Sequence, residues 1–320
     1  MRKVDYVGLG FVSNDHLAVL PFIPMDTKVK MLSHTILGGG PAGNATAGYA
    51  TLGGTAAFVG TVGDDADGRM ILDEFAREGV GTEFIRVRKG ATSAIAYLWI
   101  EEKTGNRSCA WTREGLDELT AEEVERDAGL VELIRGAKVL HLDGHNAAGA
   151  IAAAKIAKAA GVTVMYDAGT IRDGYEELLP LADLLVCSGE FAVSVAAGRS
   201  ALIQDGYTEE EVEAAVRSLY GKYHPAVCGA TMGVRGSMCF DGKALVRCPA
   251  FKVEKVVDTT GCGDLFHTGF AIRYTETHDL LECQRFGAAV SALKCRGVSG
   301  RPPACPTRAE VEAFLAAHPR

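Results

Sequence analysis

The sequence has no block of basic residues and no paired cysteine motif. Its 33 lysines and arginines stand against 41 aspartates and glutamates, which gives a formal net charge of −8 at pH 7. Nucleic acid and anionic membrane surfaces are therefore not expected partners, because both are bound mainly through clustered positive charge. The nine cysteines contain no Cys-x-x-Cys pair and no close cysteine–histidine pairing, which disfavours metal clusters and disulfide frameworks.

Long apolar segments are also missing. No apolar run is long enough to span a bilayer, and Met1-Arg2-Lys3 leads directly into a strand-like stretch, Val4 to Leu9, without the apolar region of a signal peptide. No repeat, low-complexity segment or linker divides the chain. We therefore expect a cytoplasmic protein with reduced thiols that folds as one domain over residues 1–320, and the 48% hydrophobic content supports a sizeable core.

The most informative stretch that is present is Asp258-Thr259-Thr260-Gly261-Cys262-Gly263-Asp264. An extended, β-branched lead-in from Val253 to Val257 precedes it, and an apolar run with helical spacing follows from Leu265. We predict a strand, a tight turn and a helix start. Because the first N–H groups of a helix lack intrahelical partners and lie at the positive end of its dipole, Gly261 to Gly263 would form a cradle for an anion.

Asp264 places a carboxylate beside this anion site. Two negative groups repel each other unless the carboxylate has a chemical role, so we favour a general base; an acidic residue in the first turn of a helix is the alternative. The thiol of Cys262 is predicted to have a lowered pKa at the helix N-terminus and to be shielded when the anion site is occupied. An inert thiol that points into the core is the other interpretation.

The same residues resemble the Asp-Thr-x-Gly-Ala-Gly-Asp signature of the ribokinase-like (PfkB) carbohydrate kinases, with Cys262 where alanine is usual. The resemblance implies that the Gly261, Cys262 and Gly263 turn holds the phosphoryl group in transfer. It also implies that Asp264 deprotonates the sugar hydroxyl and that Thr259 belongs to the nucleotide site.

Two further stretches extend the resemblance over nearly the whole chain. Gly38-Gly39-Gly40-Pro41-Ala42-Gly43-Asn44, before an alanine-rich helix, resembles the family's Gly-Gly-x-x-x-Asn signature, and residues 59–68 resemble its Val-Gly-x-x-Gly-x-Asp-x-x-Gly run. The resemblance implies that Gly39, Gly40 and Asn44 contact the sugar. Taken alone, the glycines would indicate only a flexible loop and a tightly packed helix.

Asn14-Asp15-His16 directly follows the first predicted strand, at the edge where α/β folds place ligand contacts. We assign Asp15, with Asn44, to orienting the acceptor, and a turn or cap residue is the alternative. The preceding Gly8-Leu9-Gly10 does not complete a dinucleotide-binding motif, because Ser13 stands in place of the third glycine.

Two stretches, Thr27 to Leu37 and Ser93 to Trp111, have the mixed polarity of short strands, and Lys103-Thr104-Gly105-Asn106 forms a hairpin-type turn in the second. We predict a separate small sheet from segments 12–38 and 91–112. In the family such a sheet is a lid over the sugar that often pairs with its twin, which implies a homodimer.

Two cations of these segments, Lys28 and Arg107, are candidates for contacts to substrate hydroxyls or to an anionic group of the substrate. Solvated surface charges are the alternative.

The chain from residue 120 onward alternates amphipathic helices with short apolar strands, which favours a parallel, doubly wound sheet. The predicted elements are helix 121–134, strand 139–142, helix 147–160, strand 162–166, a short helix near 178, strand 184–186 and helix 209–220. Asp143 and Asp167 each follow a strand, at the ligand-binding edge. Asp143 aligns with an acidic residue that contacts the sugar in ribokinases and is ranked above Asp167. A metal pair of His141 and His145 is disfavoured, because they flank a strand end.

The nucleotide site departs from the family pattern. Ser188 and Phe191 stand where many members carry Asn-x-x-Glu, which helps to position magnesium, so Glu190 or Asp143 would have to substitute through water. The metal ligands stay undefined.

Further nucleotide contacts are implied by the resemblance. Residues 231–237 resemble the family's Thr-x-Gly-x-x-Gly nucleotide-binding turn, through Thr231, Gly233 and Gly236, although such a turn alone indicates only a hairpin. Ala292 lies near the segment that walls the adenine pocket. Arg301 stands roughly where ribokinases use a serine at a potassium site, so activation by a monovalent cation is not assumed.

The resemblance therefore implies a ribokinase-like, doubly wound α/β fold, with a mostly parallel sheet flanked by helices and a small β-sheet lid. It implies an ATP- and Mg²⁺-dependent kinase acting on a primary hydroxyl of a small sugar. A ketohexose or related acid is the first choice, ahead of ribose, a nucleoside and 2-keto-3-deoxygluconate. A silent kinase-fold regulator would be expected to have lost Asp264 or the anion turn, and this chain keeps both.

Overall fold

The structure, a computed structural model, describes residues 3–319. Nine strands form one sheet in the order β13-β12-β11-β10-β9-β8-β1-β4-β5. The pairs from β11 to β5 are parallel, whereas β12 and β13 add antiparallel strands at one edge. The strands are β1 (Tyr6–Leu9), β4 (Ala56–Gly63), β5 (Gly81–Arg88), β8 (Val139–Leu142), β9 (Thr163–Ala168), β10 (Leu184–Ser188), β11 (Val227–Thr231), β12 (Ser237–Phe240) and β13 (Leu245–Cys248).

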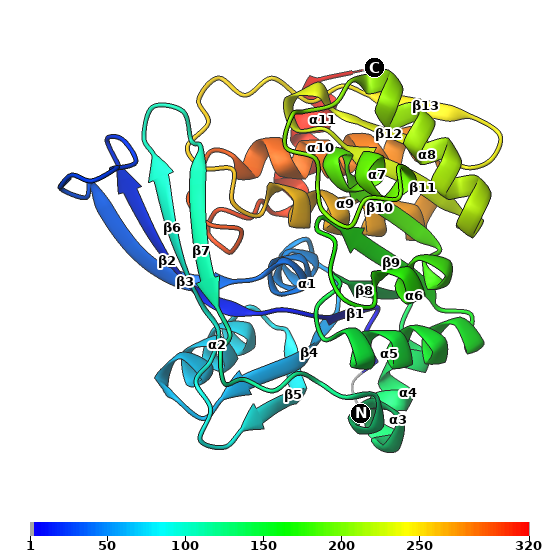
Figure 1. Ribbon diagram of the computed structural model, residues 1–320, viewed down its shortest axis with the longest axis horizontal. Helices are drawn as coiled ribbons and strands as arrows, with labels where there is room; N and C mark the ends of the chain where they lie inside the picture. The colour runs from blue at the N-terminus through cyan, green and yellow to red at the C-terminus, as the bar shows by residue number, and fades with distance from the viewer. Residues whose placement is uncertain (1–2, 320) are drawn as a thin grey trace.

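Helices cover both faces of this sheet (Figure 1). They are α1 (Pro41–Thr51), α2 (Ala66–Arg77), α3 (Ala121–Arg126), α4 (Ala128–Gly136), α5 (Ala147–Ala159), α6 (Tyr175–Leu178), α7 (Gly189–Ala196), α8 (Glu209–Tyr223), α9 (Cys262–Thr277), α10 (Leu280–Lys294) and α11 (Arg308–Ala317), with short 3₁₀ turns η1 (Leu179–Leu181) and η2 (Gly233–Arg235).

The alternation of side chains along each strand divides the core into two layers. In β10, Leu184 and Val186 pack into a cluster with α1, α9, α10 and α11, whereas Leu185 and Cys187 pack into a cluster with α3, α4, α5, α7 and α8. The predicted doubly wound α/β fold is confirmed.

The order of the strands determines where a ligand can bind. The chain builds the sheet outward from β1 through β4 to β5, and then from β8 on the other side of β1. A crevice therefore opens at the carboxyl ends of β1 and β8, where the winding reverses, and open α/β sheets bind ligands at such a point.

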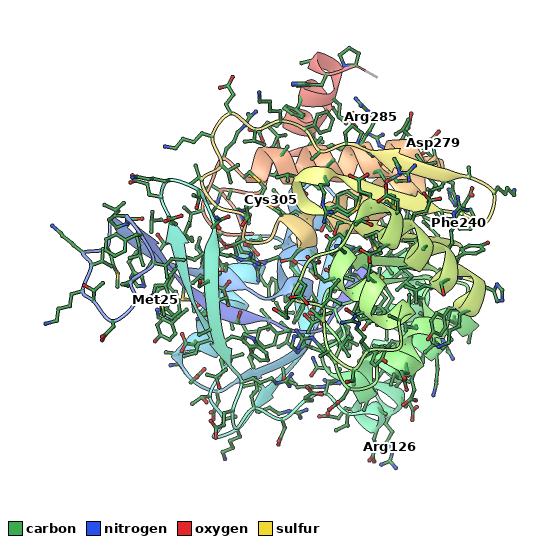
Figure 2. All side chains as sticks on the ribbon, turned by 45° about the horizontal axis from the view of Figure 1, so that its top comes forward. Met25, Arg126, Phe240, Asp279, Arg285 and Cys305 are labelled. Atoms are coloured by element: carbon green, nitrogen blue, oxygen red, sulfur yellow. The ribbon has the colours of Figure 1, made fainter. Side chains whose placement is uncertain are left out.

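A second sheet stands apart from the first, at the left of Figure 1. Its four strands are ordered β3-β2-β6-β7, with β2 and β6 parallel and both outer pairs antiparallel. These strands are β2 (Ser13–Leu20), β3 (Ser33–Gly39), β6 (Ile95–Glu101) and β7 (Arg107–Thr112). They lie inside the segments predicted for the lid, except that β3 ends one residue later, at Gly39. The loop between β2 and β3 carries Met25, which is 84% exposed and projects outward (Figure 2).

Several predicted elements differ from the structure. The expected helix 121–134 is two helices, because the Asp127 side chain accepts a hydrogen bond from Leu130 N at 3.1 Å and starts α4 there. The lead-in 253–257 forms no strand, and the strand expected from Thr27 begins only at Ser33. None of the helices within residues 3–319 is both long and apolar enough to cross a membrane.

Phe270 provides a test of how α9 is anchored. The ring is fully buried and lies 6.1 Å from the Phe266 ring and 6.3 Å from the Tyr274 ring. We expect Phe270→Ala to lower the free energy of unfolding by about 3–5 kcal/mol in urea titration, because the cavity left in this core cannot close fully. Val234, which is 95% exposed, is the control. Equal urea midpoints for Phe270→Ala and Val234→Ala would contradict this account.

Candidate active site

A cavity of about 400 Å³ opens at the predicted edge of the main sheet, under the small sheet. It collects predicted residues from distant parts of the chain: Asp15, Gly40, Asn44, Arg107, Asp143, Ser188, Thr231, Thr259, Gly261, Gly263 and Asp264. The residues that line it do not include Lys28, Gly39, Cys262, Gly233, Gly236 or Ala292. Lys28 lies on the exposed loop between β2 and β3, and Gly233 and Gly236 belong to the turn between β11 and β12.

Gly261 allows the tight turn that begins α9. Its φ is 77°, and a Cβ atom at this position would come within 2.5 Å of Gly300 Cα, so both the backbone conformation and the space require glycine. α9 begins at the next residue, Cys262, with no side chain capping its first N–H groups. Backbone donors of the turn therefore face a cavity lined by Gly261 and Gly263.

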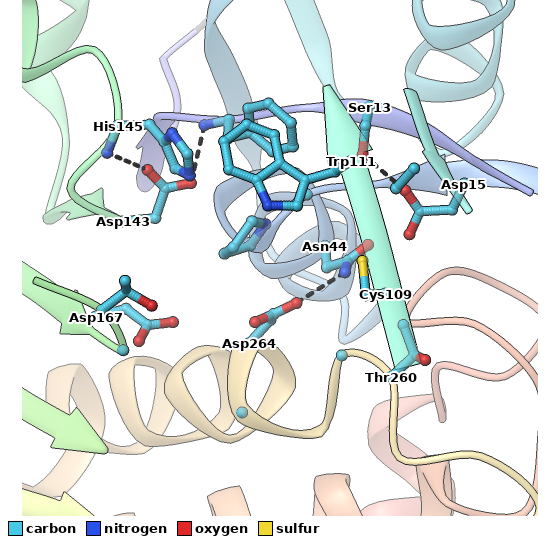
Figure 3. A pocket seen from close by; sticks show the side chains of 18 of the residues that line it. Ser13, Asp15, Asn44, Cys109, Trp111, Asp143, His145, Asp167, Thr260 and Asp264 are labelled. Carbon is cyan, nitrogen blue, oxygen red and sulfur yellow. Dashed lines mark hydrogen bonds between the residues drawn. The ribbon is translucent and has the colours of Figure 1, made fainter. Parts of the chain in front are cut away.

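Asp264 and Asn44 meet inside this cavity from α9 and α1 (Figure 3). Asn44 Nδ2 donates to Asp264 Oδ2 at 2.7 Å. Burial and, to a lesser extent, the nearby Asp167 carboxylate raise the pKa of Asp264 to about 6, against the opposing effect of the Asn44 hydrogen bond. The pKa of a general base that works near neutral pH lies in this range.

Asp15 lies near the start of β2, in a strand and not in the loop expected after β1. Its carboxylate accepts a hydrogen bond from Ser13 Oγ at 2.7 Å, and burial raises its pKa to about 6. Gly39 shapes the site indirectly, because a Cβ atom there would come within 2.1 Å of the Asp15 carboxylate.

Asp143 braces the crevice with both carboxylate oxygens. Oδ2 accepts from Phe11 N at 2.8 Å and from Ala42 N at 3.0 Å, and Oδ1 accepts from His145 N at 3.0 Å. These bonds join the end of β1, the start of α1 and the loop after β8. These backbone donors use only part of the accepting capacity of its two oxygens, and both Asp143 and Asp167 line the cavity, so the ranking of Asp143 above Asp167 for ligand contacts stays a prediction.

Asp167 lines the cavity from the end of β9, and its Oδ2 lies 3.3 Å from His267 Nδ1. Burial raises the pKa of Asp167, although the charge of His267 opposes the rise. His267, which the sequence analysis missed, has Nδ1 2.7 Å from Gly263 O and Nε2 3.1 Å from Val186 O. The only sequence signal that His267 belongs to the site was its position, one helical turn after the predicted base Asp264 and inside an apolar run.

The cavity also contains a cluster of aromatic and cationic side chains that the sequence analysis missed. The Phe11 ring stacks on the His145 ring at 4.6 Å and meets the Trp111 ring edge-on at 5.2 Å. The Arg172 guanidinium lies over Trp111 at 5.9 Å. Within residues 3–319, the side chains of Arg107 and Arg172 form no hydrogen bond or ion pair, although both line the cavity.

The thiol of Cys262 does not behave as predicted. Its Sγ lies 3.3 Å from Cys295 Sγ and 3.9 Å from Ser291 O, on the side of the turn away from the cavity. The pKa of Cys262 is raised, because its proton is shared with Cys295 and its side chain is largely buried. The hydrogen bond from Cys262 lowers the pKa of Cys295 to about 7. The prediction of a lowered Cys262 pKa is wrong, and the thiol points inward.

Residues 188–191 form the N-terminus of α7. Ser188 caps the helix by accepting from Phe191 N at 3.1 Å, and its side chain also lines the cavity. Phe191 is fully buried, with its ring edge-on to Tyr166 at 6.5 Å. Because position 191 is in the core, a carboxylate would not suit it, and Glu190 is not among the lining residues.

Residues 10–308 match the model of the pfkB family carbohydrate kinases. The chain is 32% identical over 306 residues to "Probable fructokinase-6, chloroplastic" of Arabidopsis thaliana, covering 88% of this chain and 75% of that protein. It is 26% identical over 320 residues to a ribokinase of Haemophilus influenzae, covering 98% and 99% of the two chains. The solved structure of Arabidopsis thaliana ribokinase complexed with ribose and ATP superposes with a TM-score of 0.79, at 25% identity and 98% and 99% coverage.

The fold and the site define a phosphotransferase with an alcohol group as acceptor. The chain belongs to the pfkB family of carbohydrate kinases and is a sugar kinase.

The hydrogen bond between Asn44 and Asp264 predicts a measurable pH effect. A base with a pKa of about 6 is protonated and inactive at lower pH, so kcat/KM should fall as the pH drops through about 6. Asn44→Ala removes a bond that favours the ionised carboxylate, so the acidic limb should move to higher pH.

The control for this shift is Asp15→Asn, since Asp15 also has a raised pKa. That variant should lose activity but keep the position of the acidic limb. An unchanged limb in Asn44→Ala, or a limb that disappears in Asp15→Asn, would show that Asp264 is not the titrating base.

Proposed function

We propose that this protein transfers the γ-phosphoryl group of ATP to a primary hydroxyl of a small sugar. The proposal rests mainly on one observation: Asn44 Nδ2 donates to Asp264 Oδ2 at 2.7 Å beside the Gly261–Gly263 turn, inside the cavity under the small sheet. One structural relative was solved with ribose and ATP, and other relatives are named as fructokinases and ribokinases, which supports this assignment.

In the proposed reaction, Asp264 accepts the proton of the acceptor hydroxyl while the hydroxyl oxygen attacks the γ-phosphorus in line. The N–H groups of Gly261 and Gly263 donate to the phosphoryl oxygens, where negative charge is concentrated during transfer. The N–H of Cys262 already donates to Thr259 O at 3.2 Å. Asn44 fixes the orientation of Asp264, and its own Oδ1, buried without a partner, is available to accept from a substrate hydroxyl. Thr231, Ser188 and Thr259 would contact the nucleotide.

Mg²⁺ fits this site through Asp167. That carboxylate is buried and faces the cavity, and one of its oxygens lies 3.3 Å from His267 Nδ1, so it can bind a hard cation or its water. When bound, Mg²⁺ neutralises charge on the phosphate oxygens of ATP. Asp167 therefore takes the role that the sequence analysis gave to Glu190 or Asp143.

For the substrate we propose a ketohexose or a related sugar acid, with ribose, a nucleoside and 2-keto-3-deoxygluconate as alternatives. Arg107 and Arg172 support the acid, because two guanidinium groups without hydrogen bonds or ion pairs are available to a carboxylate. A non-catalytic regulator is a weaker alternative, since the base and the anion turn occur together.

We also propose a cytoplasmic homodimer that pairs through the small sheet. That sheet and its loop expose large apolar side chains: Phe22, Met25, Met31, Leu32 and Tyr97. All nine cysteines are free thiols, as suits a reducing compartment. Sedimentation of the purified protein tests the dimer.

The role of the base predicts a specific kinetic defect. Asp264→Asn should lower kcat by roughly 100- to 10,000-fold, because the amide cannot accept the hydroxyl proton. ATP affinity should change little, since the Gly261–Gly263 turn is retained. Turnover is measured as ADP release over a panel of sugars, nucleosides and sugar acids. A variant with turnover close to that of the wild type would remove Asp264 from the mechanism.

The two arginines without ion pairs predict how substrates are discriminated. Arg107→Ala and Arg172→Ala should each raise the KM of a sugar acid by about tenfold or more, with smaller effects on a neutral ketohexose and on ATP. Arg126→Ala, at an 80% exposed side chain far from the cavity (Figure 2), is the control. Equal effects on acid and neutral sugars would mean that neither arginine recognises a carboxylate.

A further inference from the structure

A lysine that the mechanism above does not use is fully buried behind the anion turn. Lys294 is the last residue of α10 and has no exposed surface. Its Nζ donates to the Asp258 carbonyl oxygen at 2.6 Å and lies 3.5 Å from Asp258 Oδ2. Removing two charged groups from water costs free energy, so the fully buried pair of Lys294 and Asp258 calls for a functional explanation.

The partner of Lys294 holds the segment that leads into the turn. Asp258 Oδ1 accepts from Thr260 N at 2.8 Å and from Thr260 Oγ1 at 2.7 Å. Asp258 Oδ2 accepts from Ser299 N at 2.8 Å. Ser299 precedes Gly300, the residue against which Gly261 packs. The ionised carboxylate of Asp258 therefore sets the backbone on both sides of the turn.

We propose that Lys294 is a positioning residue for phosphoryl transfer, whose ammonium group acts as a built-in monovalent cation behind the Gly261–Gly263 turn and makes turnover independent of K⁺. This inference rests on the proposed kinase function. The ammonium group neutralises Asp258, so that this carboxylate keeps its hydrogen bonds without opposing the phosphate on the other side of the turn.

The charges around the turn explain why neutralisation matters. Asp264 and Asp167 already face the cavity that would receive the phosphates of ATP. Without Lys294, the Asp258 carboxylate would lose its buried cationic partner, and its negative charge would repel the phosphoryl group across the turn. The position of Lys294 at the C-terminus of α10 also favours a positive charge, because the negative end of the helix dipole lies there.

The wild-type protein gives the first test. Its kcat should be the same, within about threefold, in K⁺, Na⁺, NH₄⁺ or tetramethylammonium chloride at constant ionic strength with saturating MgATP. Activation by K⁺ beyond that range would overturn the proposal, because the site would then need an external cation.

Two variants separate the charge from the shape of the side chain. Lys294→Ala leaves space for a small cation, whereas Lys294→Met fills that space without charge. Both should lose about tenfold or more in kcat in tetramethylammonium, and only Lys294→Ala should recover, saturably, in K⁺ or NH₄⁺. Lys158→Ala, which removes a lysine paired with Asp183 at the surface, should not respond to the cation.

A readout without catalysis distinguishes failure of this inference from failure of the kinase assignment. The Tm of Lys294→Ala should rise in K⁺ or NH₄⁺ relative to tetramethylammonium, whereas the wild-type Tm should not. If no sugar is phosphorylated, the kinase proposal fails and this comparison still tests the cation site.

Other outcomes overturn the cation site. The first is a kcat equal to that of the wild type in both Lys294→Ala and Lys294→Met. The second is an equal loss of kcat in both variants that no added cation restores. The third is a Lys294→Ala protein that fails to fold in every salt.

Discussion

The site depends on one electrostatic constraint: four carboxylates must lie around a space that also accepts phosphate. Asp15, Asp143, Asp167 and Asp264 all line the cavity. Each is stabilised differently. Asp143 is bound by backbone N–H groups, Asp167 lies beside His267, and Asp264 accepts from Asn44. Asp15 and Asp264 have raised pKa values because burial is only partly compensated. A carboxylate that is compensated only in part has a pKa near neutrality, which suits a proton acceptor.

The fold meets this constraint through helix N-termini at a reversal of the winding. α1 and α9 both begin beside the cavity, where the positive ends of their dipoles favour negative charge. At the start of α1 this charge is the Asp143 carboxylate, which accepts from Ala42 N at 3.0 Å. The glycines there follow from the same requirement. Gly40 and Gly261 both have positive φ, and a Cβ atom at either would overlap neighbouring backbone. The chain therefore brings donors close to the ligand at positions where no other residue fits.

Local patterns predicted much of the fold, because the residue pattern that favours a strand or a helix is contained in a few adjacent residues. Strand 139–142 has the predicted bounds, and the signature around Gly261 lies at a helix start. The features that the sequence did not predict depend on contacts between residues far apart in the chain. Asp143 is bound by residues 132 and 101 positions away, which no local pattern shows. The inward direction of the Cys262 thiol depends on Cys295, 33 residues later. Trp111 and Arg172, which both line the cavity, come together only when the small sheet folds over it.

The joint between the two sheets has a consequence for how such a kinase can change during evolution. β1 ends at Leu9 and β2 begins at Ser13, so only residues 10–12 separate the central strand from the strand that carries Asp15. Asp15 is thus fixed close to β1, whose four residues are all buried. The β6–β7 hairpin supplies Arg107, Cys109 and Trp111, and its turn contacts the segment that leads into the anion turn, because Gly105 O accepts from Thr259 Oγ1 at 3.4 Å. New acceptor preferences can therefore arise by exchanging side chains along the two hairpin strands, while the turn at Gly105 and the geometry of phosphoryl transfer are inherited unchanged.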